Sequence, residues 1–75
     1  MNNKRREKIK TAISYIEKAN NIIEDVLYES EDARDNIPDN LSGSPIYEML
    51  EDECYELSDV VEYLNDSVDG LEGLL

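Results

Sequence analysis

The chain has 75 residues, with nineteen Asp and Glu against seven Lys and Arg, a net charge of −12, one cysteine and no histidine. A lone thiol forms neither an internal disulfide nor a zinc site, and the lack of histidine removes the usual general base near neutral pH. We therefore expect a single small domain that is not an enzyme and holds no metal or cofactor. The negative charge disfavours nucleic acid and membranes as direct partners and favours a protein with a basic surface.

Charge is unevenly distributed along the chain. Residues 1–10 carry five bases and one acid, a net of +4, whereas residues 44–75 carry ten acids and no base. No apolar stretch of the kind found in secretory signals follows the basic start, and no run approaches the roughly 20 apolar residues of a membrane span. We therefore expect a cytoplasmic protein with a reduced thiol.

Apolar residues recur with helical spacing from Ile9 onward, which predicts a helix over about residues 3–36. With Ile9 at heptad position a, three positions make an apolar stripe wide enough to face a bundle core. Position a holds Ile9, Ile16, Ile23, Ser30 and Ile37; position d holds Ala12, Ala19, Val26 and Ala33; position e holds Ile13, Asn20, Leu27 and Arg34. The small d residues would let a neighbouring helix approach closely.

A loop is expected over residues 37–44, because Pro38 lacks a backbone N–H and disfavours helical geometry in the residue before it. Ser44–Pro45 has the features of an N-cap followed by the first residue of a helix. The second helix is expected over about residues 45–72.

The second helix is as periodic as the first. One heptad position holds Leu50, Leu57, Leu64 and Leu71, a second holds Ile46, Val60 and Leu74, and a third holds Cys54, Val61, Val68 and Leu75. A leucine zipper that binds DNA needs a basic region before its leucines, and an acidic helix precedes these. The leucines are therefore expected to be core. Gly70 and Gly73 are expected to fray the helix end.

A short loop makes the two helices antiparallel neighbours, which predicts an all-α hairpin. The basic N-terminus would then lie near Asp66, Asp69 and Glu72 and would partly neutralise them. Two helices cannot enclose so wide an apolar stripe, so we expect a homodimer that forms a four-helix bundle. The alternative is that the uncovered flank binds another protein.

Two tyrosines surrounded by acids form the candidate binding site. Glycine-rich phosphate loops, calcium loops and Glu-x-x-His metal pairs are absent. On the predicted polar faces, Tyr28 has Glu24, Asp25, Glu31 and Asp32 as helical neighbours, and Tyr55 has Glu51, Asp52 and Asp59. Tyrosine is common in interface hot spots, and an acidic rim would select a basic partner. The alternative is ordinary surface tyrosine.

Acidic density on the second helix invites a comparison with nucleic acid. Ten carboxylates fall between Glu48 and Glu72, a span of about 36 Å, or roughly one charge per 3.6 Å. A DNA strand carries one charge per roughly 3.4 Å of axis. Such a helix could compete for a basic groove that binds DNA or RNA. The alternative is that the charge serves solubility only.

The sequence also resembles a group of small acidic helical-hairpin proteins of phages and prophages of Gram-positive bacteria. The resemblance rests on Lys4-Arg5-Arg6-Glu7-Lys8-Ile9-Lys10, on Asp35-Asn36-Ile37-Pro38-Asp39-Asn40-Leu41, on the turn at Gly43-Ser44 and on the acidic second helix. Ser44-Pro45-Ile46-Tyr47 departs from the charged helix start typical of that group. The resemblance implies a phage accessory protein that blocks a host nucleic-acid-binding or defence protein in the bacterial cytoplasm. The competing function is a coiled-coil oligomerisation module.

Overall fold

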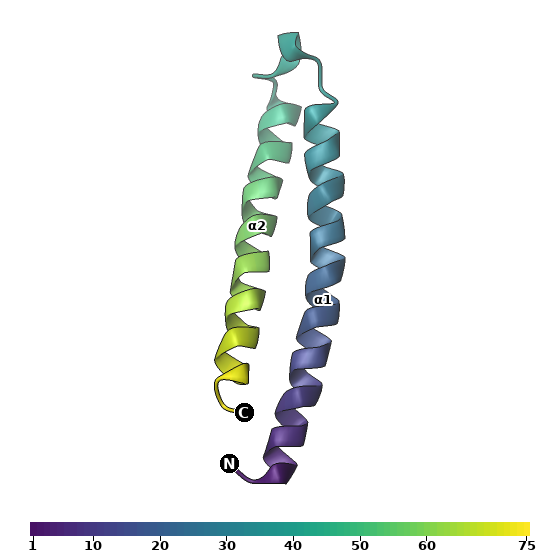
Figure 1. Cartoon of the computed structure of the whole chain (residues 1–75). Coiled ribbons are helices and arrows are strands. Elements are labelled where there is room, and N and C mark those ends of the chain that lie inside the picture. The colour runs from purple at the N-terminus through teal and green to yellow at the C-terminus, as the bar shows by residue number, and fades with distance from the viewer.

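The computed structural model describes all 75 residues and is an antiparallel hairpin of two long helices. Helix α1 spans Asn3–Asp35 and helix α2 spans Pro45–Glu72, with the short 3-10 helix η1 at Asp39–Leu41 between them. Both termini lie at one end of the rod and the loop at the other (Figure 1). The rod measures 59 × 15 × 12 Å. The predicted all-α antiparallel hairpin is confirmed.

Side-chain caps begin both helices. The Asn2 side chain accepts a hydrogen bond of 2.9 Å from the backbone N–H of Arg5. The Ser44 hydroxyl accepts one of 3.3 Å from the backbone N–H of Tyr47, as expected of an N-cap. These oxygens satisfy N–H groups that have no partner within the helix. At its other end α1 stops at Asp35, one residue before the expected end.

The contact of α1 with α2 centres on heptad positions a and e, and Glu24 and Glu31 at position b are half-buried beside it. The residues at positions a and e are buried or half-buried: Ile9, Ile13, Ile16, Asn20, Ile23, Leu27, Ser30, Arg34 and Ile37. All four d residues are exposed: Ala12, Ala19, Val26 and Ala33. The predicted close approach of a helix at position d is therefore not made by α2. Successive residues turn by about 100°, so position d lies roughly a quarter turn from the contact with α2 and a single neighbouring helix does not reach it.

α2 contributes the predicted leucines to the same contact. Leu50, Leu57, Leu64 and Leu71 are half-buried, as are Val60, Val61 and Val68; Cys54 is buried, and Ile46, Leu74 and Leu75 are exposed. The predicted fraying at Gly70 is wrong, because α2 continues to Glu72 and no glycine has a positive φ. Gly73 is the C-cap.

The buried core of the hairpin is thin. Ile13 and Cys54 are the only buried apolar residues, and Asn20 and Ser30 are buried beside them. The Asn20 amide donates a hydrogen bond of 2.9 Å to the Asn65 side-chain oxygen, while its own oxygen is buried without a partner. Because the core is so small, many apolar side chains of both helices remain in contact with water.

The basic N-terminus forms no ion pair with the acidic end of α2, which it was predicted to neutralise in part. The two ion pairs are local, Lys10–Glu7 at 3.3 Å and Arg34–Asp35 at 3.1 Å, and none joins the helices. The start of α1 extends past the end of α2 (Figure 1), so the first basic residues have no acidic neighbour across the hairpin. Neither helix combines the length and apolar character needed to cross a membrane.

Candidate functional site

Each side of the hairpin combines one flank of α1 with one flank of α2. The hydrogen-bonded pair Asn20 and Asn65 shows which two flanks lie on the same side. Asn20 lies on the side of the contact next to the flank of α1 that carries Glu24. Asn65 belongs to the flank of α2 that carries Glu51, two heptads away. Because these asparagine side chains are hydrogen bonded, the two flanks lie on the same side. The remaining flanks, with position d of α1, lie on the opposite side.

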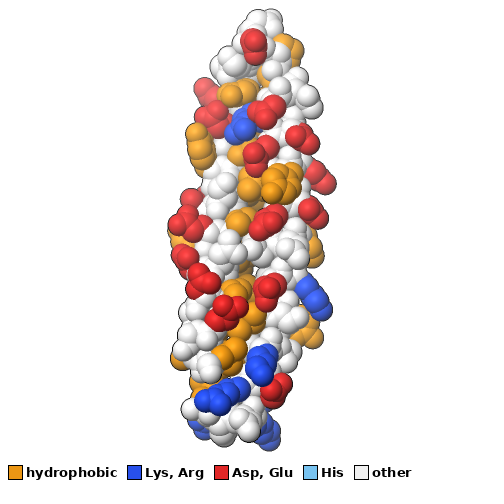
Figure 2. All heavy atoms as spheres, viewed as in Figure 1, with side chains coloured by type: hydrophobic (Ala, Val, Ile, Leu, Met, Phe, Trp, Pro, Cys, Tyr) orange, Lys and Arg blue, Asp and Glu red, His pale blue; other side chains and the backbone are white.

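One side of the hairpin is acidic. What we term the acidic face consists of nine carboxylates with two tyrosines: Glu17, Glu24, Glu31 and Asp35 of α1, Glu48, Glu51, Glu62, Asp69 and Glu72 of α2, and Tyr28 and Tyr55. Figure 2 views this side, where acidic side chains line both helices along an apolar seam. By the seam we mean the line of contact between α1 and α2. Lys and Arg side chains gather at the end that holds the termini. Toward the termini this side continues with Lys10, its one base, and with Glu7, which forms an ion pair with Lys10.

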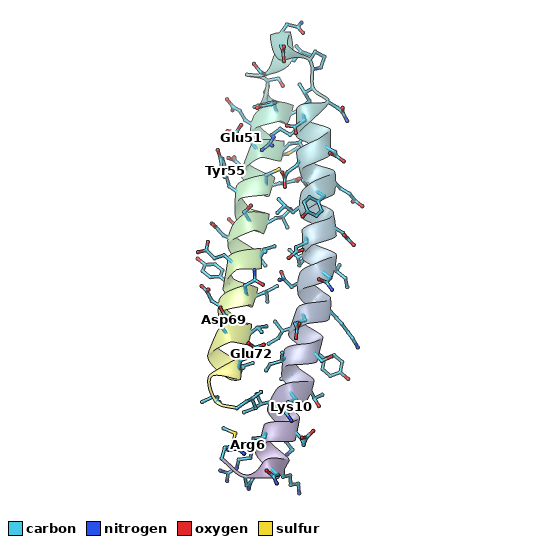
Figure 3. The ribbon with its side chains drawn as sticks, viewed as in Figure 1. Arg6, Lys10, Glu51, Tyr55, Asp69 and Glu72 are labelled. Carbon is cyan, nitrogen blue, oxygen red and sulfur yellow. The ribbon has the colours of Figure 1, made fainter.

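The two tyrosines of the acidic face lie at nearly the same height on the rod. Tyr28 is eight residues after Asn20 and Tyr55 is ten before Asn65, so they differ by two residues, or about 3 Å along the axis. Their exposed fractions are similar, 62% and 64%. In Figure 3, Tyr55 and Glu51 project from the upper half of α2 and Asp69 and Glu72 from its lower half. The two tyrosines predicted as separate candidates thus lie on one side of the rod at nearly one height.

The structure divides the nine predicted site residues into two sets. Five lie on the acidic face: Tyr28, Glu24, Glu31, Tyr55 and Glu51. The other four lie on the outer edges of the rod, turned away from the opposite helix: Asp25 and Asp32 on α1, Asp52 and Asp59 on α2. A ring of helical neighbours around each tyrosine could not include the other six carboxylates of this face, because each lies seven or more residues from the tyrosine of its helix: Glu17, Asp35, Glu48, Glu62, Asp69 and Glu72. A heptad register for both helices would have found them.

Charge density on the acidic face depends on both helices. The ten carboxylates of α2 point in several directions, and only five of them lie on this face. With those of α1, nine carboxylates cover about 36 Å, or roughly one per 4 Å. That remains close to the roughly 3.4 Å of a single DNA strand.

Arg34 and Cys54 lie together inside the seam. Arg34 is the only Lys or Arg after Lys18, and its hydrogen bond to Asp35 raises its pKa. Burial raises the pKa of the Cys54 thiol, and the positive charge of Arg34 opposes that shift. A buried, protonated thiol is a poor nucleophile. The chain holds no group of three or more His, Cys, Asp or Glu side chains placed to bind a metal ion.

The side opposite the acidic face is apolar and small-residue rich. What we term the uncharged face has ten positions, none of them charged: Ala12, Tyr15, Ala19, Ile22 and Val26 of α1, and Val60, Tyr63, Ser67, Gly70 and Leu74 of α2 and the turn after it. Ile22 is 64% exposed and Tyr63 68% exposed. The predicted uncovered flank is therefore present. Tyr15, Ile22 and Tyr63 were not predicted as part of this flank, although they lie three or four residues from d positions.

A separate apolar cavity of about 400 Å³ lies at the loop end of the rod. It is lined by Ile37, Pro38, Leu41, Ser44, Pro45 and Ile46. No charged group lines it, so it offers apolar contact and little chemistry.

Comparison with known proteins finds no family model, no curated protein and no solved structure that matches this chain.

Proposed function

We propose that this protein is a small non-enzymatic binding protein whose acidic face docks on a basic surface of another protein. The observation that supports this is the pair of exposed tyrosines, Tyr28 and Tyr55, at one height within nine carboxylates. Tyrosine supplies a large contact area, and the surrounding charge steers a basic partner toward it. The buried Cys54 and the lack of histidine favour binding over catalysis.

The partner we propose is a host nucleic-acid-binding or defence protein in the cytoplasm of a bacterium. A rigid face with nearly the charge density of a nucleic-acid strand can occupy a groove that otherwise holds a phosphate backbone. The resemblance to small acidic phage proteins supports a bacterial host. On this proposal the protein acts as an inhibitor that mimics nucleic acid and contacts no nucleic acid itself.

Capture from a bacterial lysate on the immobilised full-length chain would identify the partner by mass spectrometry. Binding of the purified partner to Tyr28→Ala and Tyr55→Ala would then be measured by calorimetry, which reports affinity per hairpin. Each substitution should weaken binding by about 2 kcal/mol or more, roughly 30-fold, if the tyrosines are hot spots. Tyr63→Ala removes an equally exposed tyrosine from the opposite side and should bind like the parent.

Charge reversals separate steering from contact. Asp25→Lys and Asp52→Lys, beside the tyrosines, should slow association and reduce its salt dependence. Asp66→Lys makes the same charge change far from the tyrosines, and its effect should be smaller. Duplex DNA should displace the partner if the groove is a nucleic-acid site. Equal binding by all tyrosine variants would refute the acidic-face proposal.

The second candidate function is an oligomerisation module that forms a four-helix bundle as a homodimer. The exposure of Ile22 and Tyr63 favours it, because neither side chain is needed within the hairpin. The two functions are compatible, since they use opposite sides of the rod. The sedimentation mass of the parent at tens of micromolar tests the homodimer, and a concentration-independent monomer would refute it.

A further inference from the structure

We infer that a second copy of this chain docks on the uncharged face in the antiparallel orientation, with α1 on α1 and α2 on α2. The result is a four-helix bundle in which every helix is antiparallel to its neighbours and both acidic faces point outward. This inference deepens the proposed oligomerisation role and rests on it. It is independent of the partner proposed for the acidic face.

Charge repulsion prevents two copies from pairing through their acidic faces, so the uncharged face is the side that two copies can share. Each copy carries a net charge of −12, and two acidic faces placed together would bring nine carboxylates against nine. Like charges opposed in an interface cost several kcal/mol. The uncharged face has no acid at any of its ten positions.

The charges at the two ends of the uncharged face select the antiparallel orientation. Lys8 continues the face toward the termini, and Glu29, Glu53 and Glu56 continue it toward the loop. A two-fold axis across the middle of the face places Lys8 of each copy beside Glu29 of the other. The alternative axis along the rod places basic ends together and acidic ends together.

Residue size along α1 follows the same two-fold symmetry. The middle of the α1 part of the face is Ala19, and a second α1 running in the opposite direction places Ala19 against Ala19. Ala12 then faces Val26 of the second copy, so a small residue meets a larger one. Tyr15 faces Ile22. An isologous interface requires this kind of self-complementarity.

α2 repeats the pattern around its own small central residue. Ser67 lies within one residue of the height of Ala19, because Asn65 is paired with Asn20. An antiparallel second α2 places Tyr63 against Gly70 of the other copy. The small residues at the centre allow the helices to approach closely.

Nothing within the isolated hairpin explains why a glycine, Gly70, lies inside α2. A glycine inside a helix costs about 0.5–1 kcal/mol relative to alanine. Gly70 has no positive φ to require it, and a Cβ added there would meet nothing within 4 Å. Open space beside a helical glycine is what an incoming tyrosine ring needs, and the two-fold axis supplies Tyr63 at this position.

The face is large enough for a specific dimer. From Lys8 to Glu29 it is about 32 Å long, and the rod is 15 Å wide. The projected area is therefore about 500 Å² per copy, or about 1,000 Å² for the pair, which reaches the minimum expected of a biological interface.

Disulfide trapping of full-length variants tests the orientation. In a Cys54→Ser background, Ala19→Cys places two thiols across the two-fold axis, and Asn21→Cys places one on the acidic side at the same height as a control. Mild oxidation at low protein concentration should link Ala19→Cys into a covalent dimer at least tenfold faster than Asn21→Cys. Helical circular dichroism of each variant before oxidation should equal that of the parent.

Mixed cysteine variants separate the two orientations. Antiparallel stacking predicts fast linkage between Ala12→Cys and Val26→Cys chains. The axis along the rod instead predicts linkage between Val26→Cys and Val60→Cys chains, and that result would overturn this inference while leaving the oligomerisation role standing. A parent that sediments as a monomer at tens of micromolar would overturn both.

Discussion

The acidic face and the uncharged face are built from the same two helices, and they differ only in heptad position. Both contain two exposed tyrosines, yet Tyr28 and Tyr55 lie among nine carboxylates while Tyr15 and Tyr63 lie among alanine, serine and glycine. Self-repulsion makes the first side unsuitable for a second copy and suitable for a basic protein. The lesson is that a strongly charged rod can keep one side free of charge.

The largest effect is expected for thiol labelling of Cys54, which lies in the seam between the two faces. Cys54 is buried there, and burial raises the pKa of its thiol. A bulky thiol reagent should therefore label the native protein about 100-fold more slowly than the urea-unfolded chain, because the thiolate is the reactive form. Fast native labelling would contradict the close packing of the seam.

The same shift in pKa has a consequence for stability. Because the folded thiol titrates at a higher pH than the unfolded one, its contribution to the free energy of unfolding is present below pH 9 and declines as the pH rises above it. Urea melts of Cys54→Ser should lack this part of the pH dependence.

Gly70→Leu should act oppositely on the helix and on the dimer. Leucine favours helix by about 1 kcal/mol over glycine, but its side chain would fill the space that the Tyr63 ring needs, and overpacking costs about 1–3 kcal/mol. We expect a dimer dissociation constant at least tenfold higher with undiminished helical circular dichroism. Ser58→Leu, on the acidic side, is the control and should leave dissociation unchanged.

Substitutions at the two members of the asparagine pair, Asn20 and Asn65, should change the stability of the hairpin in opposite directions. Asn65→Ala leaves the buried Asn20 amide without a partner and should lower the free energy of unfolding by about 1–2 kcal/mol. Asn20→Leu fills the seam and leaves the exposed Asn65 to water, so it should raise the melting temperature. Two thermal melts check this, and a loss of stability in both would show that the pair is not a net cost.

Salt should have the smallest effect. Raising ionic strength to about 0.15 M shortens the reach of charge to about 8 Å and weakens the self-repulsion of the rod. We expect the melting temperature to rise by about 5 °C, equivalent to about 1 kcal/mol for a chain of this size. Glu62→Lys with Asp69→Lys should reduce the rise, and a fall in melting temperature would indicate that attraction of the basic N-terminus dominates.

Much of the fold could be predicted from sequence, because strong local signals mark it. Pro38 ends one helix, Ser44 caps the next, and the leucines of α2 repeat every seven residues. Each of these signals acts within a few residues, so no knowledge of the neighbouring helix is needed.

The faces were harder to predict, because they depend on which edge of a wide stripe meets the other helix. Nothing local distinguishes a contact at positions a and e from one at a and d. The contact with α2 decides between them, and it joins residues far apart in the chain, such as Asn20 and Asn65, which are 45 residues apart. For the same reason the sequence identified two tyrosine sites but not their alignment, and it included Asp25 and Asp52 in a face that they do not join.

A matched pair of substitutions on α2 tests the division between the two faces most directly. Tyr55 and Tyr63 are eight residues apart, 64% and 68% exposed, and on opposite sides of the rod. Sedimentation equilibrium of Tyr55→Glu and Tyr63→Glu at tens of micromolar compares the same chemical change on each side. We predict a dimer for Tyr55→Glu and a folded monomer for Tyr63→Glu. Equal masses for the two variants, or a monomer only for Tyr55→Glu, would contradict this account.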